Sequence, residues 1–505
     1  MIPTTLWLLL CLQIVLGTFD MLFHHELTER LAWRRSQRRE LFLHGMRNLF
    51  YAVLFAGLGL VEVHGALAWV AVGILVLELL ITLKDFVEED RSRKLPASER
   101  ITHTLLALNY GAILAYLLPI LVVWSDQPTA MVGADRGLWG YFMLLSAAGV
   151  SVFAVRDLAA ARRLGRMQAR PVATLIPKAL PKQSVLIAGG TGFIGSRLAN
   201  ALITRGHRVT VLTRRFENAV GLDAPVRVVT DLAQIASDEP IDAIVNLAGE
   251  PIAGWLWTGR RRRALLRSRL KTTRRLVALA ARLDRRPACF VSGSAIGIYG
   301  ANADAVADEH TRIGDDGSFA YRLCAAWEAE ALKMERLGVR TVLLRTGIVL
   351  DTEGGSLGQM LVPFEFCAGG PFGDGGHWMS WITRDDLVRL IGHCLGEPAL
   401  RGAVNGVAPN PVRNRDFAAA LGRALRRPAV IPVPAFVLET ALGDLAREIF
   451  LGSQNLRPTK ALENGFRFDA PDLDVALKEL VGTQPARARE HSTLWDRRFR
   501  GAGRA

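Results

Sequence analysis

The fold of this chain is decided by the stretch SVLIAGGTGFIGSRLANALITRGHRVTVLTRR, Ser184 to Arg215. It opens on a short apolar run, Val185–Ala188, which is followed by a glycine-rich turn and an amphipathic helical pattern. A second apolar run, Arg208–Leu212, comes after the helix. Strand, glycine turn, helix and strand in this order predict a βαβ unit.

The glycines of GGTGFIG have the spacing of a dinucleotide-binding turn. Gly189 permits the tight turn, Gly192 lets the backbone approach a pyrophosphate, and Gly195 lets the helix pack closely on the strand. The helix begins at about Phe193 and Ile194, so its N-terminal amides would face the phosphates. A plain glycine turn is the alternative, and the strand–turn–helix context argues against it.

The end of the second strand indicates which dinucleotide is bound. An NAD enzyme usually carries Asp or Glu there, but this chain has Thr213, Arg214 and Arg215. Two cationic side chains suit the 2′-phosphate of NADP. Solvated arginines at a strand end are the alternative. Further along, VNLAG ends a strand in small residues, so we expect Ala248 and Gly249 to lie beside the cofactor.

Further strand-like runs alternate with helical patterns after this unit, at Ala243–Leu247, Cys289–Ser292 and Thr341–Arg345. This alternation predicts an α/β Rossmann domain with a doubly wound parallel sheet. We place the domain at residues 184–485, with a small C-terminal substrate subdomain, and a basic tail at residues 486–505.

The first third of the chain has a different character. The whole chain has 505 residues, half of them hydrophobic, a net charge of +14 and a mean hydropathy of +0.21. This composition favours a membrane protein with cytoplasmic arginines over a nucleic-acid binder, for which we find no recognition motif. About five apolar segments approach bilayer-spanning length, so residues 1–163 are predicted to form an all-α membrane bundle, joined by a linker at 164–183. The segments lie near residues 5–17, 49–63, 66–83, 105–124 and 138–155.

Arginine and lysine residues predict the orientation of this bundle. They concentrate after the first, third and fifth segments and are absent from the short loops near Val63–Gly65 and at SDQPTAMVGAD. The positive-inside rule then places the N-terminus outside an inner, cytoplasmic membrane and the catalytic domain in the cytoplasm. Free cysteines without CxxC spacing fit the same reducing compartment.

Histidines and carboxylates gather at the predicted cytoplasmic ends of these helices. Intramembrane carboxylates are functional candidates, and imidazole with carboxylate is a metal-ligating combination. Three interpretations stay open: a metal site, a lipid-headgroup or proton-relay site, and plain interfacial polarity. The metal candidates are His24, His25, His44, Glu78, Asp85 and His103, with Asp20 and Glu89 beside them.

Several separated motifs add a resemblance to a known family. GGTGFIG, VNLAG, SGSAIGIYG and SWITRDDL together resemble the extended short-chain dehydrogenase/reductase superfamily. AYRLCAAWEAEA, RTGIVLDTEGGSLGQMLVPF and the C-terminal GSQNLRPTKALENGFRFDAPDLDVAL narrow the resemblance to its atypical, nucleoside-diphosphate-sugar epimerase-like branch. The resemblance covers about residues 184–481 and implies enzymatic activity with a nicotinamide cofactor. It does not cover the membrane part.

The superfamily's catalytic Tyr–Lys pair is missing from this sequence. If Glu328 aligns with the acid that follows that pair, Ala320 and Cys324 occupy the two places. The resemblance assigns the catalytic serine to Ser294. Tyr299 is the nearest phenol in the motif, and Tyr321 is a further candidate that stands one residue out of register.

These observations lead to three functional hypotheses. The first is a membrane-tethered NADP-dependent oxidoreductase or epimerase-like enzyme that acts on a small, lipid-like or membrane-associated substrate. The second is a catalytically weak NADP-binding sensor or scaffold, because the Tyr–Lys pair is missing. The third is a two-centre redox protein, in which the histidine and carboxylate cluster holds a metal. The sequence gives no indication of the oligomeric state.

Overall fold

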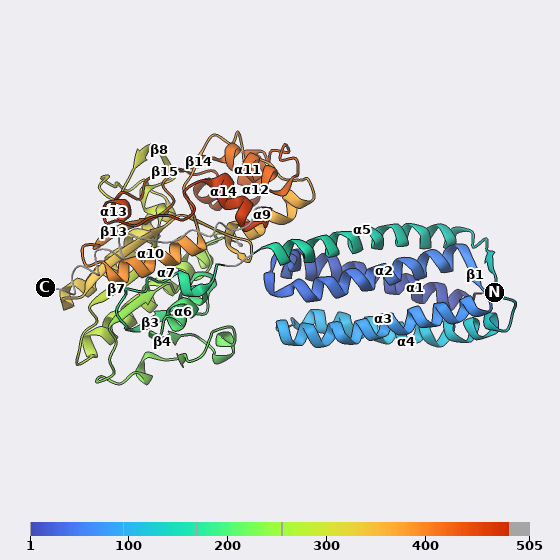
Figure 1. Ribbon diagram of the computed structural model, residues 1–505. Helices are drawn as coiled ribbons and strands as arrows, with labels where there is room; N and C mark the ends of the chain where they lie inside the picture. The colour runs from blue at the N-terminus through green and yellow to red at the C-terminus, as the bar shows by residue number, and fades with distance from the viewer. Residues whose placement is uncertain (1, 94, 168–169, 254–255, 484–505) are drawn as a thin grey trace. The chain divides into compact units, whose positions relative to one another are not determined.

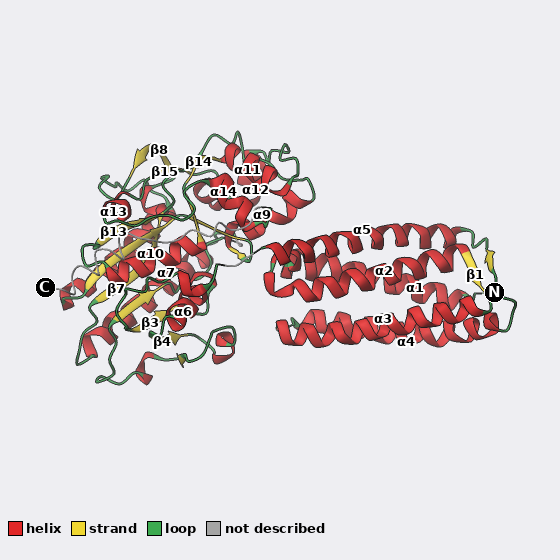
Figure 2. Cartoon of the chain, viewed as in Figure 1, coloured by secondary structure: helices red, strands yellow, loops and turns green. Residues whose placement is uncertain are grey.

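The computed structural model describes residues 2–93, 95–167, 170–253 and 256–483 of the chain, and the predicted basic tail lies outside them. The chain divides into two compact units, Met1–Gln168 and Ala169–Ala505. We call these unit 1 and unit 2. Figure 1 traces both along the sequence, and Figure 2 shows that unit 1 is almost wholly helical whereas unit 2 mixes helices with strands.

Unit 1 is a bundle of long helices. They are α1 (Thr4–Phe19), α2 (Arg38–Leu60), α3 (Ala66–Ser92), α4 (Ala97–Ser125) and α5 (Leu138–Arg166). α2 packs on α5 and α3, and α4 packs on α1 and α3, as Figure 1 illustrates. At one end, β1 (Val61–Val63) pairs antiparallel with β2 (Met131–Gly133).

The outer surface of this bundle is apolar. Large side chains such as Trp69, Leu108, Leu145 and Val152 are mostly exposed, while Leu6, Ile113 and Leu117 fill the centre. A helix that is apolar on both its inner and outer faces is typical of a membrane environment. Five helices of the described residues are long and apolar enough to cross a bilayer, in agreement with the expected number.

The first helix differs from expectation at its polar end. α1 continues without a break into a π-helix, η1 (Asp20–Glu29), which ends at Arg30 in the left-handed conformation (φ 53°). Two short 3₁₀ turns, η2 (Leu31–Trp33) and η3 (Arg35–Gln37), lead into α2. The helix extends past the apolar run because its polar side chains have partners inside the bundle.

Unit 2 contains a seven-stranded sheet of order β13-β9-β7-β6-β3-β4-β5, whose neighbours all pair in parallel. From β3, the chain adds strands first on one side and then on the other, so the strand order reverses between β3 and β6. This confirms the predicted doubly wound parallel sheet. The strands are β3 (Ser184–Ala188), β4 (Arg208–Leu212), β5 (Arg227–Val229), β6 (Ala243–Asn246), β7 (Cys289–Ala295), β9 (Arg340–Thr346) and β13 (Gly402–Gly406).

Helices cover both faces of this sheet. On one face, α6 (Phe193–Thr204) and α10 (Arg384–Gly396) pack on a core that contains Val185 and Ile187. On the other, α7 (Gly259–Arg282) and α8 (Phe319–Ala331) pack on a core that contains Leu186 and Ala188. Alternate residues of β3 therefore point to opposite faces, and both faces are buried, as parallel strands require.

Smaller elements complete unit 2. Three two-stranded pairs join segments that are distant in sequence: β8 (Asn302–Ala307) with β15 (Ser453–Leu456), β10 (Ile348–Asp351) with β12 (Trp381–Thr383), and β11 (Trp378–Met379) with β14 (Val412–Arg413). The remaining helices are α9 (Gly355–Glu365), α11 (Asn414–Leu425), α12 (Ala435–Leu442), α13 (Thr459–Glu463) and α14 (Leu473–Leu480). The C-terminal segment thus folds back onto the connection that follows β7.

The predicted linker, residues 164–183, is only partly a linker. α5 extends through Arg166, and residues 168–169 lie outside the described part of the chain. Beyond them, Leu175, Ile176 and Leu180 are fully buried in the core of unit 2. Apolar side chains inside a proline-rich stretch account for this packing, because their burial stabilises the ordered segment.

Candidate functional site

The glycine turn after β3 forms a close-packed cradle. Gly189 has a left-handed φ of 83°, and a Cβ built there would lie 2.8 Å from the carbonyl carbon of Leu247. A Cβ on Gly195 would collide with the carbonyl oxygen of Gly189. Both positions therefore require glycine. α6 begins at Phe193, so its first backbone amides have no helical acceptor and are available to an anion.

Phe193 and Ile194 contribute backbone amides at the start of α6, while their side chains pack elsewhere. The ring of Phe193 lies against Gly354 and beneath the Arg384 guanidinium, which is 5.0 Å from its centroid. Ile194 packs on the core of unit 2. Both side chains anchor the start of the helix, so that its amides are held in place.

The end of β6 lies next to this turn. The backbone amide of Leu247 donates to Ala188 at 2.8 Å, which fixes the two strand ends together. Asn246 is fully buried, and its amide donates to the Thr273 hydroxyl at 2.9 Å. Ala248 and Gly249 follow; a Cβ on Gly249 would lie 3.1 Å from the guanidinium carbon of Arg269. Burial lowers the pKa of Arg269.

Arg214 and Arg215 are exposed just beyond β4. Arg214 forms an ion pair with Glu250 at 3.2 Å, and its side chain is 87% exposed. An ion pair this exposed contributes at most about 1 kcal/mol, so it can exchange for another anion. The two guanidiniums are thus available to a phosphate at the strand end.

A second group of polar side chains lies at the carboxyl ends of β7 and β9. Ser294 and Arg345 are cross-strand partners in the sheet, and Glu328 reaches them from α8. The Ser294 hydroxyl donates to Glu328 Oε1 at 2.6 Å. Arg345 donates to both Glu328 oxygens, each at 2.9 Å. All three residues are buried.

Tyr299 extends this network. Its hydroxyl accepts a hydrogen bond from Arg345 Nη1 at 3.0 Å and donates to Asn405 Oδ1 at 2.9 Å. Burial raises the pKa of Tyr299, although Arg345 opposes the shift. Tyr299 therefore keeps its proton at neutral pH. Serine hydroxyl, phenol, guanidinium and carboxylate are joined in one hydrogen-bonded group, which can position and protonate a substrate oxygen.

The remaining candidates on α8 lie apart from this group. Cys324 is buried one turn before Glu328, and burial raises its pKa to about 12, so its thiol stays protonated. Tyr321 is half-buried near the start of α8, where its backbone amide is capped by the Ser318 hydroxyl at 3.1 Å. The structure thus brings Ser294 and Tyr299 into one network, whereas Tyr321 takes no part in it.

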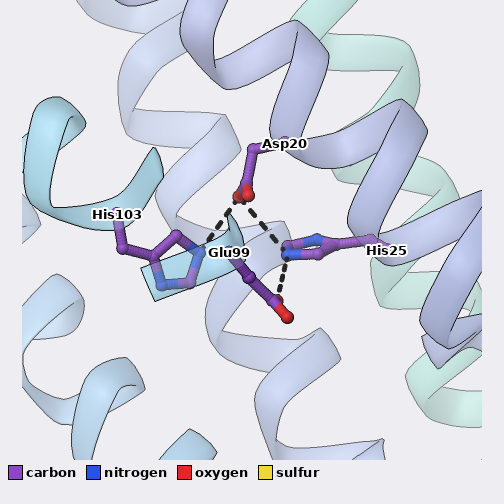
Figure 3. A group of neighbouring side chains, drawn as sticks. All are labelled: Asp20, His25, Glu99 and His103. Atoms are coloured by element: carbon purple, nitrogen blue, oxygen red, sulfur yellow. Dashed lines mark hydrogen bonds and ion pairs between the residues drawn. The ribbon is translucent and has the colours of Figure 1, made fainter. Parts of the chain in front are cut away.

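Unit 1 contains a separate buried cluster of histidines and carboxylates. Four of them lie together in Figure 3, where the ligand atoms of Asp20, His25, Glu99 and His103 point toward one another. His44 and Glu89 form a second group with His25. The ligand atoms within each group lie within 4.8 Å of one another, and all of these residues are buried.

The other predicted metal candidates lie around this cluster. His24 bonds to Asp20 Oδ1 at 2.8 Å and to the Ser98 hydroxyl at 3.2 Å. Asp85 contacts His44 Nε2 at 2.9 Å and Arg47 Nη1 at 3.1 Å. Glu78 accepts a hydrogen bond from Thr82 at 2.9 Å, one helical turn away on α3, and belongs to neither group.

The sequence did not predict every member of the buried cluster in unit 1 or of the hydrogen-bonded group around Ser294 in unit 2. Glu99 precedes the fourth apolar segment, and Arg345 lies in an apolar strand, so neither stood out as a ligand or a proton-network residue. A signal was present for Arg345: a lone charge inside a buried strand requires a buried partner. From the sequence, Glu328 only indicates where the superfamily's Tyr–Lys pair would stand, and its contacts with Ser294 and Arg345 appear in the structure.

Comparisons with known proteins locate the family resemblance in unit 2. Residues 185–405 match the NAD dependent epimerase/dehydratase family, and residues 433–480 match a domain of unknown function, DUF1731. The epimerase family protein SDR39U1 of Homo sapiens is 36% identical over 299 residues, which span 59% of this chain and 99% of that protein.

Two further relatives agree. The epimerase family protein YfhF of Bacillus subtilis is 35% identical over 300 residues, which span 59% of this chain and 98% of that protein. The crystal structure of human SDR39U1 (isoform 2) with NADPH matches with a TM-score of 0.54 and 34% identity, and it covers 60% of this chain and 100% of that one. Both matched family segments lie within unit 2.

Proposed function

The chain belongs to the NAD dependent epimerase/dehydratase family, and from this premise we propose that residues 184–485 form an NADP(H)-dependent oxidoreductase or epimerase-like enzyme. In this proposal the enzyme is anchored in a membrane by the five helices between residues 4 and 166 that are long and apolar enough to cross a bilayer. The observation that carries the proposal is the cradle at Gly189 and Gly195, which excludes any side chain and leads directly into the first turn of α6, where backbone amides have no helical acceptor.

The residues of this cradle fit a dinucleotide. The amides at the start of α6 would hold the pyrophosphate, and Ala248 and Gly249 would lie beside it after the end of β6. The human relative, which is 34% identical, was crystallised with NADPH. When bound, NADP(H) supplies or accepts a hydride at the substrate carbon.

Selectivity for NADP(H) over NAD(H) is assigned to Arg214 and Arg215. Their position at the end of β4 is where the adenosine ribose lies in this fold. A guanidinium pairs well with a phosphate, and the weak contact between Arg214 and Glu250 is exchangeable. No acidic residue stands at the end of β4 to accept a ribose diol.

Proton transfer is assigned to Ser294 and Tyr299. Tyr299 holds its proton at neutral pH and can donate it to a substrate oxygen, while the adjacent Arg345 stabilises the phenolate that forms. Glu328 accepts the hydrogen bond from Ser294 and thereby orients that hydroxyl. Arg345 and Glu328 are positioning residues in this scheme.

A lipid-like or membrane-associated substrate fits an enzyme fixed to a bilayer. The positive-inside distribution supports an inner-membrane protein with its N-terminus outside and its catalytic domain in the cytoplasm. A domain held at the membrane meets lipid-soluble molecules more often than a freely diffusing one would.

The test uses the full chain in lipid nanodiscs with NADPH deuterated at nicotinamide C4. Lipid extracts and soluble metabolites are offered separately, and products are analysed by mass spectrometry. Deuterium in an organic-extractable product supports the proposal. NADPH binding without deuterium transfer to either fraction overturns the oxidoreductase. If the chain with NADP⁺ also isomerises none of the offered compounds, the epimerase-like enzyme is overturned too, and the second candidate, an NADP-binding sensor or scaffold, is favoured. This candidate is favoured because Ala320 and Cys324 stand where the superfamily usually has the Tyr–Lys pair, when Glu328 is aligned with the acid that follows it.

A further inference from the structure

The interior of unit 1 contains more buried ionisable side chains than its hydrogen bonds account for. His25, His44 and His103 are buried among the carboxylates of Asp20, Glu40, Asp85, Glu89 and Glu99. Two guanidiniums, Arg47 and Arg93, balance part of this charge. Burying so many ionisable groups in a bundle that faces lipid is unfavourable unless they have a partner or a function.

The distances within the cluster match metal coordination. His25 Nε2 lies 3.4 Å from Asp20 Oδ2 and 3.7 Å from Glu99 Oε1, and His103 Nε2 lies 3.2 Å from Asp20 Oδ2 (Figure 3). Ligands that bind one ion at about 2.1 Å in tetrahedral geometry lie about 3.4 Å apart. Two of these three separations exceed ordinary hydrogen-bond lengths and suit donors that surround one ion.

A nitrogen without a hydrogen bond points into the cluster. His25 Nε2 is buried, and it makes no hydrogen bond within the described part of the chain, although two carboxylates lie 3.4 and 3.7 Å away. Its side chain is only 8% exposed. A buried imidazole nitrogen without a hydrogen bond is unfavourable, and imidazole nitrogen is a common metal ligand.

The stacking of His25 on His44 disfavours the main alternative, an ion-pair network of protonated histidines. The two rings lie 4.5 Å apart between centroids and are nearly parallel, at 7°. Two imidazolium rings stacked face to face would repel each other, whereas a metal ion bound by His25 supplies positive charge beside the carboxylates without a second charged ring in the stack.

The π-helix explains how these ligands meet. In an α-helix, residues five apart point in different directions, whereas the wider π-turn brings Asp20 and His25 to one face. His24, a predicted metal candidate one residue earlier, instead bonds to the other carboxylate oxygen of Asp20, Oδ1, and orients the carboxylate.

We propose that Asp20, His25, Glu99 and His103 bind one divalent first-row transition-metal ion. Two imidazoles with two carboxylates suit Fe²⁺, Mn²⁺ or Zn²⁺ better than Mg²⁺ or Ca²⁺. Outer partners support the ligands: His103 Nδ1 lies 3.3 Å from Glu89 Oε2, and Arg93 donates to Glu99 Oε1 at 2.6 Å. A carboxylate behind a ligating histidine fixes its tautomer. This inference is independent of the proposed function of unit 2.

The test begins with metal analysis of the full chain, purified in detergent without chelator. We expect about one equivalent of iron, manganese or zinc per chain. His103→Asn and Glu99→Gln should each lower the content at least about tenfold. His64→Asn is the matched control, because His64 is also a buried histidine of unit 1 but contacts Glu62, outside the cluster.

A second measurement keeps the proposal falsifiable if a variant fails to fold. Wild-type protein is stripped with chelator and titrated with Co²⁺, which should give visible d–d bands that saturate at one equivalent and a higher unfolding midpoint. Less than about a tenth of an equivalent of native metal, together with no cobalt spectrum, overturns the proposal. Equal metal loss in His64→Asn and His103→Asn overturns it as well.

Discussion

Replacing Glu328 by Gln tests the buried network at the carboxyl ends of β7 and β9. The Glu328 carboxylate accepts one hydrogen bond from Ser294 and two from Arg345. An amide keeps one acceptor but turns a donor toward the guanidinium, and it leaves the Arg345 charge buried and uncompensated. Breaking a buried ion pair in this way lowers the free energy of unfolding by about 3–5 kcal/mol. Because Gln retains part of the hydrogen bonding, we expect a loss of about 3 kcal/mol.

The assay is thermal unfolding of the full chain in detergent, followed by tryptophan fluorescence. For a unit of this size, 3 kcal/mol corresponds to a midpoint lower by about 4–5 °C. Glu330→Gln is the matched control on the same helix, because its partners Arg274 and Lys333 are 62% and 47% exposed. That variant should lose at most about 1 kcal/mol. A Glu328→Gln midpoint within about 2 °C of the control would refute the reasoning.

Three further experiments test contacts in unit 2. Gly195→Ala should abolish NADPH binding in a fluorescence titration, because its Cβ would collide with Gly189, whereas Gly221→Ala has open space and should bind as wild type does. Replacing Arg214 and Arg215 together by Ala should weaken NADPH about tenfold to a hundredfold and NADH less than about threefold in the same titration; equal losses would count against a 2′-phosphate contact. Burial, with Lys182 and Arg205 nearby, lowers the pKa of His207 to about 4 from 6.5, so the unfolded chain binds the proton first. The free energy of unfolding should therefore decrease by up to about 3 kcal/mol as the pH falls from about 6.5 to 4. In His207→Asn the unfolding midpoint should depend less on pH over this range.

The parts of the fold that sequence predicts well are the local ones. The central strands and the turn from Gly189 to Gly195 were predicted because strand, turn and helix signals lie within one short segment. The edge strands β5 and β13 were not predicted. β5 has only three residues and β13 begins and ends with glycine, so each gains its stability from the neighbouring strand rather than from its own pattern.

The sites were predictable only in part, because their members meet through tertiary structure. Ser294 and Glu328 are 34 positions apart, and the register between β7 and β9 brings Arg345 beside them. In unit 1, the π-helix rotates His25 rather than His24 into the cluster, and no local sequence signal indicates that change of period. The residue types were therefore visible in the sequence, but their grouping was not.

We propose above that unit 2 binds NADP(H) in preference to NAD(H). The most direct measurement is isothermal titration calorimetry of the full chain, in nanodiscs, with NADPH and NADH under identical conditions. We expect one NADPH per chain, bound at least about tenfold more tightly than NADH. Equal affinities for the two dinucleotides, or no binding of either, would contradict it.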